Sequence, residues 1–301
     1  MKDHVAVVTG ATSGIGLHIA RGLATAGYEV VIVARNEEKA RAARAEIGRA
    51  AGDAARVHVE LANLASLDAV EALAGRIAAT YPDLSLLVNN AGVLAAKKEL
   101  SPDGIDLELA VNHVAPFLLT WRLLPTLRRR GGRVVNVNSD SHEKATLEQA
   151  DLAPGAPYKF MASYGKSKLA SMAATVELAS RIPPGEVMIN AVHPGMVATN
   201  IGASGGFKGV AWALMKPFLL SPQKGAETPV WAGTSPDLAG ASGNYYKMKA
   251  LAEMNPQARD RHIREMVWAW TLDLAHIHDA DRSASASSSA ACSHPGTDGA
   301  R

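Results

Sequence analysis

The segment VAVVTGATSGIGLHIA, residues 5–20, places a strand, a glycine-rich turn and a helix in direct succession. Its first residues predict a buried strand over 5–9, and a helical pattern begins at about residue 14. A glycine-rich turn at a helix N-terminus lets backbone amides approach a phosphate closely. Three residues separate the first two glycines, unlike the Gly-x-Gly-x-x-Gly fingerprint, so a purely structural turn is the alternative. The expected pyrophosphate-binding residues are Gly10, Thr12, Ser13, Gly14, Ile15 and Gly16.

The same alternation of short apolar runs and longer helical patterns continues to about residue 250. It predicts repeated βαβ units, and therefore a single-domain, Rossmann-type, doubly wound α/β fold with helices on both faces of a seven-stranded parallel sheet. The expected strands are Val5–Thr9, Glu29–Ala34, Arg56–Glu60, Leu84–Asn89, Arg133–Asn138, Val187–His193 and Asn244–Tyr246. The expected helices cover about 14–26, 37–50, 66–80, 104–130, 158–181 and 222–235.

Composition limits the class of protein. The chain has 301 residues, 48% of them hydrophobic, which suits one catalytic domain over 1–280, while the Ser- and Ala-rich stretch 281–301 is expected to be a disordered tail. A formal net charge of +2 without a basic stripe argues against a nucleic-acid partner. Cys292 is the single cysteine, so we expect no internal disulfide, no thiolate metal site and a cytoplasmic location. The first residues lead directly into a strand, so no membrane span is expected.

The end of the second strand indicates which dinucleotide binds. Folds of this kind place a carboxylate there to hold the ribose 2′-hydroxyl of NAD, but the sequence is Val33-Ala34-Arg35-Asn36. Arg35 offers a guanidinium to a 2′-phosphate, which favours NADP(H) over NAD(H), with NAD(H) kept as the second choice. A surface arginine that opens a helix is the alternative interpretation. Glu60 and Leu61, at the end of the third strand, are expected beside the adenine.

Two further segments carry amides where apolar residues would be usual. Asn90, Ala91 and Gly92 follow the fourth strand and are small enough to lie beside a nucleotide. Asn112 interrupts an apolar helical stretch, and Pro116 four residues later removes a backbone hydrogen bond. We expect a polar site that lines this kink.

Tyr164 and Lys168 are four residues apart on a predicted helix, so they share one face. A tyrosine with an ordinary pKa near 10 is a poor base at neutral pH, but a neighbouring cation favours the phenolate and lowers that pKa. Such a pair is common by chance, so its context matters. Ser139 ends the fifth strand at the same edge of the sheet, where its hydroxyl would share a substrate oxygen with Tyr164. A serine that only caps the strand end is the alternative.

The turn after the sixth strand is expected to face the nicotinamide. It is followed by an apolar segment, Ile201–Leu220, which we interpret as a lid. The expected cofactor contacts of the turn are Pro194, Gly195, Val197 and Thr199.

In this combination and order, the motifs resemble the short-chain dehydrogenase/reductase family over about residues 3–250. Within it, the sequence is most similar to the branch of retinol dehydrogenases and WW-domain oxidoreductases. The residues that carry the family resemblance are Thr9–Gly16, Asn89–Gly92, Asn112, Ser139, Tyr164, Lys168 and Pro194–Gly195. The residues that carry the branch resemblance are Val33–Asn36, Val111–His113, Val135–Val137, His142 and His193–Gly195.

The resemblance implies an enzyme that interconverts an alcohol and a ketone or aldehyde by hydride transfer. It implies that Tyr164 is the general acid/base and that Ser139 holds the substrate oxygen. Lys168 would bind the nicotinamide ribose and tune Tyr164, and Asn112 would hold a water in a proton relay. A homodimer or homotetramer is implied as well, because the family commonly pairs its long helices.

The expected partner is a small-molecule substrate, a partly apolar alcohol or carbonyl compound. Asn138 and Asp140 stand where the branch more often has serine and an apolar residue, and Glu60 stands where aspartate is usual. The extra polarity favours a carbonyl reductase for a bulky metabolite over a retinoid enzyme. The expected substrate contacts are Ser139, Asp140, His142 and Met196.

Two other functions would use some of the same residues. A regulator that senses NADP(H) without turnover needs the glycine turn and Arg35, but not Ser139, Tyr164 and Lys168. A methyl-transfer enzyme on a similar fold has no need of a tyrosine and a lysine four residues apart.

Overall fold

The computed structural model describes residues 4–153, 155–197 and 220–277. Its centre is one eight-stranded sheet with the order β3-β2-β1-β4-β5-β6-β7-β8, in which only the pair of β7 and β8 is antiparallel. The strands are β1 Val5–Thr9, β2 Glu29–Ala34, β3 Val57–Leu61, β4 Leu84–Asn89, β5 Arg133–Val137, β6 Met188–His193, β7 Tyr245–Lys247 and β8 Ala250–Leu251. All seven predicted strands are present within two residues of their expected ends.

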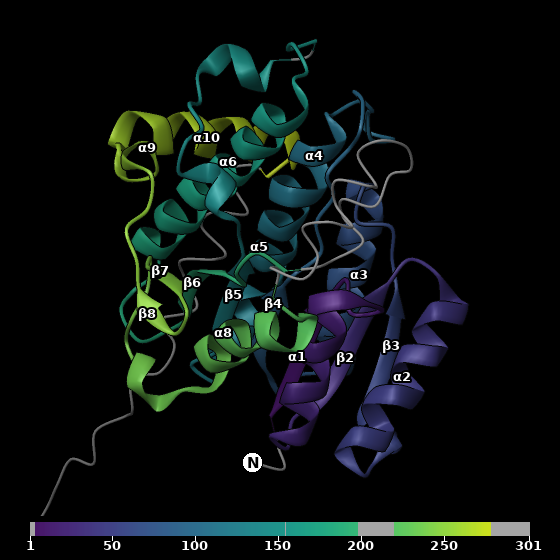
Figure 1. The fold of residues 1–301 in the computed structure, drawn as a ribbon. Coiled ribbons are helices and arrows are strands. Elements are labelled where there is room, and N and C mark those ends of the chain that lie inside the picture. Colours follow the sequence, from purple (N-terminus) through teal and green to yellow (C-terminus); the bar gives the residue numbers. More distant parts are fainter. Residues whose placement is uncertain (1–3, 154, 198–219, 278–301) are drawn as a thin grey trace, which may run out of the picture.

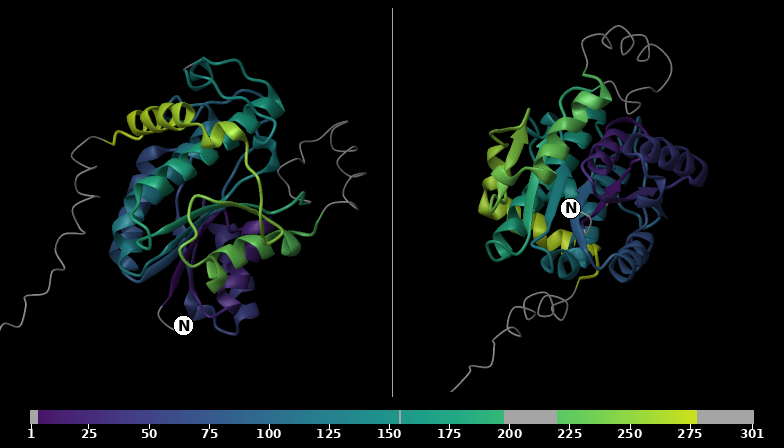
Figure 2. Two further views of the ribbon diagram at one scale, coloured as in Figure 1. Left: turned by 90° about the vertical axis from the view of Figure 1, so that its left-hand side faces the viewer. Right: turned by 90° about the horizontal axis from the view of Figure 1, so that it is seen from below.

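Helices cover both faces of the sheet (Figure 1). One face carries α1, α2 and α8, and the other carries α3, α5 and α6, with α9 and α10 outside α6 (Figure 2). This arrangement confirms the expected doubly wound α/β fold. The helices are α1 Gly14–Thr25, α2 Glu37–Ala51, α3 Leu67–Thr80, α4 Leu107–Leu109, α5 Ala115–Arg128, α6 Phe160–Arg181, α8 Pro222–Thr234, α9 Pro256–Arg259 and α10 Arg261–Leu274.

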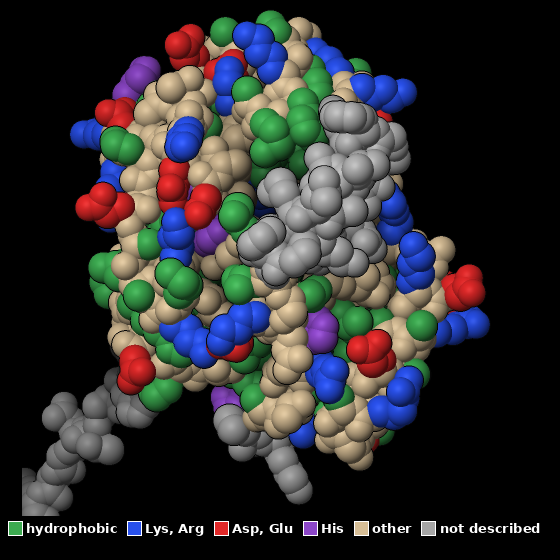
Figure 3. Space-filling model, in the orientation of Figure 1, with side chains coloured by type: hydrophobic (Ala, Val, Ile, Leu, Met, Phe, Trp, Pro, Cys, Tyr) green, Lys and Arg blue, Asp and Glu red, His purple; other side chains and the backbone are tan. Residues whose placement is uncertain are grey.

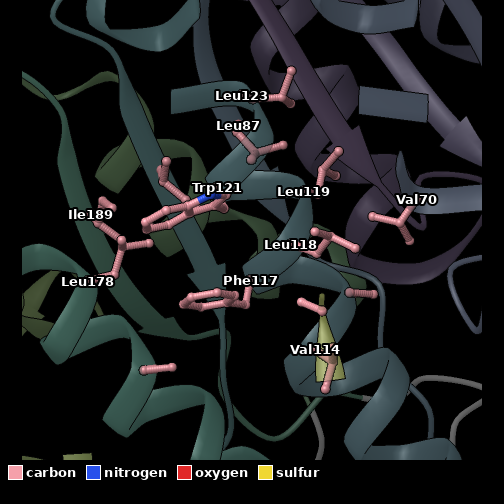
Figure 4. Packing of buried hydrophobic residues seen from close by; sticks show 14 of the residues in the cluster. Val70, Leu87, Val114, Phe117, Leu118, Leu119, Trp121, Leu123, Leu178 and Ile189 are labelled. Atoms are coloured by element: carbon pink, nitrogen blue, oxygen red, sulfur yellow. The ribbon is translucent and has the colours of Figure 1, made fainter. Parts of the chain in front are cut away.

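Each face of the sheet has its own apolar core because the side chains of a strand alternate between faces. Val5 and Val7 of β1 point to the α3, α5 and α6 side, whereas Ala6 and Val8 point to the α1 and α8 side. Around Phe117, the close-up shows leucines and valines from the sheet and helices packed together (Figure 4). The two cores hold the strand ends in fixed register, so side chains at those ends are held in place too.

Four elements differ from the expectation. The predicted helix over 104–130 is divided into α4, a π-helical turn at Ala110–Val114, and α5. The strand β8 extends the sheet beyond the seven expected strands, after a turn in which Met248 and Lys249 have positive φ. The sequence prediction also lacked α9 and α10, which both pack against α6.

The predicted lid up to residue 219, Thr199 and the predicted tail 281–301 lie outside the described residues. Among the residues that the structure does describe, no helix is long and apolar enough to cross a membrane. On the face drawn in Figure 3, acidic and basic side chains are interspersed.

Candidate active site

The glycine turn after β1 is tightly built. Gly10 and Gly14 have positive φ values of 66° and 57°, which favour glycine. A Cβ on Gly16 would lie 2.3 Å from both the Asn90 Nδ2 and the Gly10 carbonyl oxygen, so only glycine lets α1 begin this close to the turn. Ser13 precedes α1 but makes no side-chain capping bond, and no acidic residue follows in the first turn. The amides at this helix end therefore have no side-chain acceptor, which suits an anionic pyrophosphate.

Arg35 and Glu60, the two charged residues at the sheet edge beside the glycine turn, differ in whether they have a partner. Arg35 is exposed at the end of β2 and has no hydrogen bond or ion pair within the described parts of the chain. Glu60 at the end of β3 accepts a hydrogen bond of 2.9 Å from Arg76 Nε, and the Leu61 carbonyl accepts another from the same guanidinium at 3.0 Å. Arg35 is thus free to meet a phosphate, while the Glu60 carboxylate that we expected at the adenine already has a partner.

The loop after β4 is fixed to the glycine turn. Asn90 donates from Nδ2 to the Thr9 carbonyl at 2.8 Å, and its backbone N–H donates to Thr9 Oγ1 at 3.0 Å. The Ala91 N–H donates to the same hydroxyl at 3.0 Å. A Cβ on Gly10 would lie 2.9 Å from the Ala91 Cα, so the two loops touch. The structure therefore brings the expected residues Asn90, Ala91 and Gly92 beside the glycine turn.

Asn112 lies in the π-helical turn and is buried. Its Oδ1 accepts from the Val93 N–H at 2.8 Å, and its Nδ2 donates to the Val93 carbonyl at 2.9 Å and to Ser167 Oγ at 3.0 Å. The side chain is thus occupied, but its backbone carbonyl lacks the usual donor because Pro116 has no N–H. π-Helical turns of this kind are frequent at functional sites.

Tyr164 and Lys168 lie together on α6, as expected. Lys168 Nζ is 5.8 Å from the centroid of the Tyr164 ring, is buried, and donates to the Val137 carbonyl at 3.1 Å. Burial lowers the pKa of Lys168 to about 8, so the ammonium form still predominates at pH 7.

The pKa of Tyr164 moves opposite to our expectation. Burial raises it to about 12, while a hydrogen bond from Ser139 lowers it and the Glu108 charge raises it further. Desolvation of the phenolate outweighs the effect of Ser139, so in this state Tyr164 is a protonated acid. The effect of Ser139 on the Tyr164 pKa agrees with the expected proximity of the two hydroxyl groups.

Asn138 and His142 contact the backbone of Ser139. Asn138 Oδ1 accepts from the Ser139 N–H at 2.7 Å, and its Nδ2 donates to the Lys168 carbonyl at 3.1 Å. His142 is fully buried, and its Nδ1 lies 2.6 Å from the Ser139 carbonyl. The structure thus places both side chains in support of the serine, and not at the substrate, where we expected the polarity of Asn138 and the ring of His142.

Asp140 is the centre of a polar network beside Ser139. Its Oδ1 accepts from the Tyr245 hydroxyl at 2.8 Å, and its Oδ2 pairs with Lys247 at 2.9 Å and His193 at 3.3 Å. The Lys247 and Tyr245 hydrogen bonds and the His193 charge lower its pKa despite burial, so Asp140 is a carboxylate at neutral pH. At 38% exposure it is still accessible to a polar substrate group.

The turn after β6 returns to the glycine turn. A Cβ on Gly225 of α8 would lie 2.5 Å from Val197, 3.3 Å from the Pro194 carbonyl and 3.5 Å from Ile15, so these segments meet. Leu220 N–H donates to the Met196 carbonyl at 2.8 Å, which joins the last residue of the predicted lid to the turn after β6. Met196 itself is 65% exposed and therefore open to a ligand.

Sequence reasoning missed two residues in this region. Glu108 is only 1% exposed and lies one helical turn before Asn112. Its Oε1 accepts from the Ala95 N–H at 2.8 Å and lies 3.3 Å from the Tyr158 hydroxyl. A glutamate among apolar residues, four positions before Asn112, was the available signal.

Comparison with known proteins agrees with this geometry. Residues 4–206 match the family model described as short chain dehydrogenase. The chain belongs to the short-chain dehydrogenase family. The dehydrogenase is 35% identical to mouse retinol dehydrogenase 12 over 91% of this chain and 86% of the relative, and 37% identical to mouse polyprenol dehydrogenase over 90% and 83%.

A solved structure of a metagenomic short-chain oxidoreductase in complex with NADP is 28% identical to the dehydrogenase, with a TM-score of 0.61 over 82% of this chain and 97% of that one. Together the family and its relatives show that the dehydrogenase is a nicotinamide-dependent oxidoreductase that acts on CH–OH and C=O groups. They also confirm the resemblance to the retinol-dehydrogenase branch.

Proposed function

We propose that this dehydrogenase uses NADP(H) to interconvert an alcohol and a ketone or aldehyde, with Tyr164 as the general acid/base. The observation that supports it best is the buried Lys168 ammonium, one turn after Tyr164 and 5.8 Å from its ring centroid, with Ser139 near enough to lower the Tyr164 pKa. The pair lies at the carboxyl edge of the sheet, where doubly wound folds bind their ligands.

Each side chain has a definite task in carbonyl reduction. When bound, the nicotinamide supplies the hydride. Ser139 Oγ and Tyr164 Oη donate hydrogen bonds to the carbonyl oxygen, and Tyr164 transfers its proton to that oxygen as charge develops. Lys168 stabilises the phenolate that remains. The proton is then replaced by a relay, for which the Asn112 carbonyl is the group without a helical donor.

The choice of NADP(H) rests on Arg35. Its exposed guanidinium has no partner among the described residues, and the end of β2 has no carboxylate to hold a ribose hydroxyl or to repel a phosphate. The uncapped start of α1 suits the pyrophosphate. NAD(H) would use the same turn without the contact to Arg35.

For the substrate we propose a partly apolar carbonyl compound with one polar group. Met196 provides exposed apolar surface and Asp140 an accessible carboxylate. A homo-oligomer in the cytoplasm stays our prediction on the sequence grounds given above.

The function can be tested directly. NADPH and NADH binding is measured by titration, and oxidation of NADPH is followed at 340 nm with a panel that includes all-trans-retinal, long-chain polyprenals and aromatic ketones. The proposal is supported if the enzyme turns over and needs a lower concentration of NADPH than of NADH to do so. NADPH binding without turnover on any compound would favour the sensing regulator.

Tyr164→Phe tests the acid/base role. The variant keeps the ring, so NADPH affinity should stay within about twofold, while turnover should fall about 10²- to 10⁴-fold because the proton donor is lost. Stopped-flow absorbance at 340 nm measures the chemical step. Turnover close to the unaltered enzyme would show that the proton comes from another group.

A further inference from the structure

Two loops that border the site are joined by one small polar cluster. It consists of Glu108, the Tyr158 hydroxyl and the backbone of Ala95. Ala95 belongs to the loop after β4, and Tyr158 lies in the segment that leads into α6, which carries Tyr164. The Tyr158 hydroxyl donates to the Ala95 carbonyl, and the Ala95 N–H donates to Glu108 Oε1 at 2.8 Å.

Asn112 continues this support one helical turn later. Glu108 accepts a hydrogen bond from Ala95. The Asn112 side chain binds both the N–H and the carbonyl of Val93. Asn112 also donates to Ser167, whose hydroxyl donates to the Tyr164 carbonyl at 2.8 Å. The two side chains thus fasten one loop to the helix that carries the phenol.

We propose that Glu108 is a positioning residue of this dehydrogenase, an inference that rests on the function proposed above. Its carboxyl group fastens the loop after β4 to the segment before α6, and so holds Tyr164 in place relative to the nicotinamide.

The neutral form of Glu108 is the one that fits this position. The Tyr158 hydroxyl has one proton, and that proton is directed to the Ala95 carbonyl. The same hydroxyl also donates toward Glu108 Oε1 at 3.3 Å, so its one proton is shared between the Ala95 carbonyl and the carboxyl group. Glu108 Oε2 is buried without a hydrogen-bond partner among the described residues, a poor environment for a charge. The neutral acid avoids an unpaired buried charge, keeps the bond from the Ala95 N–H to Oε1, and competes only weakly for the Tyr158 proton.

Ionisation of Glu108 would weaken the hydrogen bond between Tyr158 and Ala95. A carboxylate can only accept, so it would take the Tyr158 proton and leave the Ala95 carbonyl without its donor. Burial raises the pKa of Glu108 to about 7, against the hydrogen bonds from Ala95 and Tyr158, and the nearby Asp106 raises it further. The connection between Tyr158 and the Ala95 carbonyl thus weakens as the pH rises through neutrality.

The charged neighbours of the cluster act in the same direction. Asp106 precedes α4, and Glu99, in the preceding loop, acts on Tyr158. On α6 the facing titratable group is Tyr164, whose pKa is raised by a charge on Glu108. Ionised Glu108 therefore both loosens the loop and makes Tyr164 a weaker acid.

The first arm of the test needs no substrate. The full chain is labelled with ¹³C at the glutamate carboxyl and tyrosine ζ carbons, and the two signals are assigned by Glu108→Gln and Tyr164→Phe. We expect the Glu108 carboxyl to titrate near pH 7 and the Tyr164 signal to shift with the same midpoint, a shift that Glu108→Gln abolishes. Tyr158→Phe should move the midpoint. A Glu108 midpoint in the ordinary range, or a Tyr164 signal indifferent to it, overturns the proposal whether or not a substrate is known.

The second arm uses turnover with a carbonyl compound identified from the panel. Between pH 6 and 8, kcat/KM for reduction should fall about tenfold in the unaltered enzyme, as the neutral fraction of Glu108 falls from about nine-tenths to about one-tenth. In Glu108→Gln, which is always neutral, the fall should be about twofold. The control Glu99→Gln changes an exposed acid of the neighbouring loop and should keep the tenfold fall. A Glu108→Gln profile parallel to that of the unaltered enzyme, at any absolute rate, overturns the proposal.

Discussion

Arg35 is the residue on which the cofactor choice depends. A hydrogen bond to a charged group contributes about 1.5–3 kcal/mol, so Arg35→Ala should raise the Kd of NADPH about ten- to a hundredfold. The Kd of NADH should change less than about twofold, because NADH has no 2′-phosphate. Isothermal titration of both nucleotides measures this, with the exposed Arg41→Ala on α2 as the control. Equal losses for both nucleotides would remove Arg35 from the phosphate site.

Tyr164 gives the two reaction directions opposite pH dependences. Alcohol oxidation needs the phenolate, and burial raises the pKa of Tyr164 to about 12, so its rate should climb from pH 7 to 10, by up to about tenfold per pH unit. Carbonyl reduction uses the protonated phenol and should not climb. Initial rates at 340 nm in both directions give the profiles. An oxidation rate independent of pH would mean that the bound cofactor lowers the pKa of Tyr164 below 7.

Residue types and their order predicted the chemistry, but not every environment. Ser139, Tyr164 and Lys168 were predictable because each stands at a strand end or on one helix face, and both positions follow from periodicity. The direction of the Tyr164 pKa was not, since desolvation depends on everything packed around the ring. His142 was expected at the substrate for a similar reason. Its burial behind Ser139 comes from β7, whose Tyr245 ring packs edge-on against it at 4.9 Å.

At the scale of elements, the contact between α1 and the loop after β4 can be tested with one methyl group. Gly16→Ala would place a Cβ 2.3 Å from Asn90 Nδ2 and the Gly10 carbonyl, so α1 must shift and the NADPH Kd should rise at least about tenfold. Gly75→Ala in α3 is the matched control, because a Cβ there meets nothing within 4 Å. It should leave NADPH binding unchanged and stabilise the fold by about 0.5–1 kcal/mol. An unchanged Kd in Gly16→Ala would contradict this contact.

The strands were predictable because buried parallel strands are short, β-branched and bounded by turn residues. The π-helical turn was not, since its extra residue is invisible to a 3.6-residue period, although Pro116 marked a disturbance. The strand β8 has only two residues, and its turn uses Met248 and Lys249 at positive φ without glycine. Its existence depends on pairing with β7. The helix α10 is strongly amphipathic, but it follows the last predicted strand, where the βαβ pattern gives no expectation.

For the molecule as a whole, α10 closes the core on the α5 and α6 side. Trp268 packs against Phe117 and Trp121 with ring centroids 5.3 and 5.8 Å apart, and Arg181 of α6 lies over its ring at 4.3 Å. Trp268→Ala should lower the free energy of unfolding by about 3–5 kcal/mol. Urea denaturation followed by circular dichroism measures it. Trp270→Ala, on the less buried side of α10, should cost less, and equal costs would argue against this packing.

The same helix bears on the expected oligomer. α10 contacts α5 and α6 from within the chain through Trp268, and it contacts the π-helical turn through the hydrogen bond of 2.7 Å between His113 Nε2 and Thr271. A second copy would therefore have to bind at a different face, or displace α10 at the cost of its apolar contacts.

The hydrogen bond between Met196 and Leu220 has a consequence for how such a protein diversifies. The backbone leaves the sheet and returns to it at neighbouring points, so residues inserted between these points leave the register of β6 and the start of α8 intact. Doubling the length of a closed flexible loop costs only about 0.6 kcal/mol. Related chains can therefore differ in length and sequence between these two points while the strand ends and the helix around Ser139 and Tyr164 keep their places.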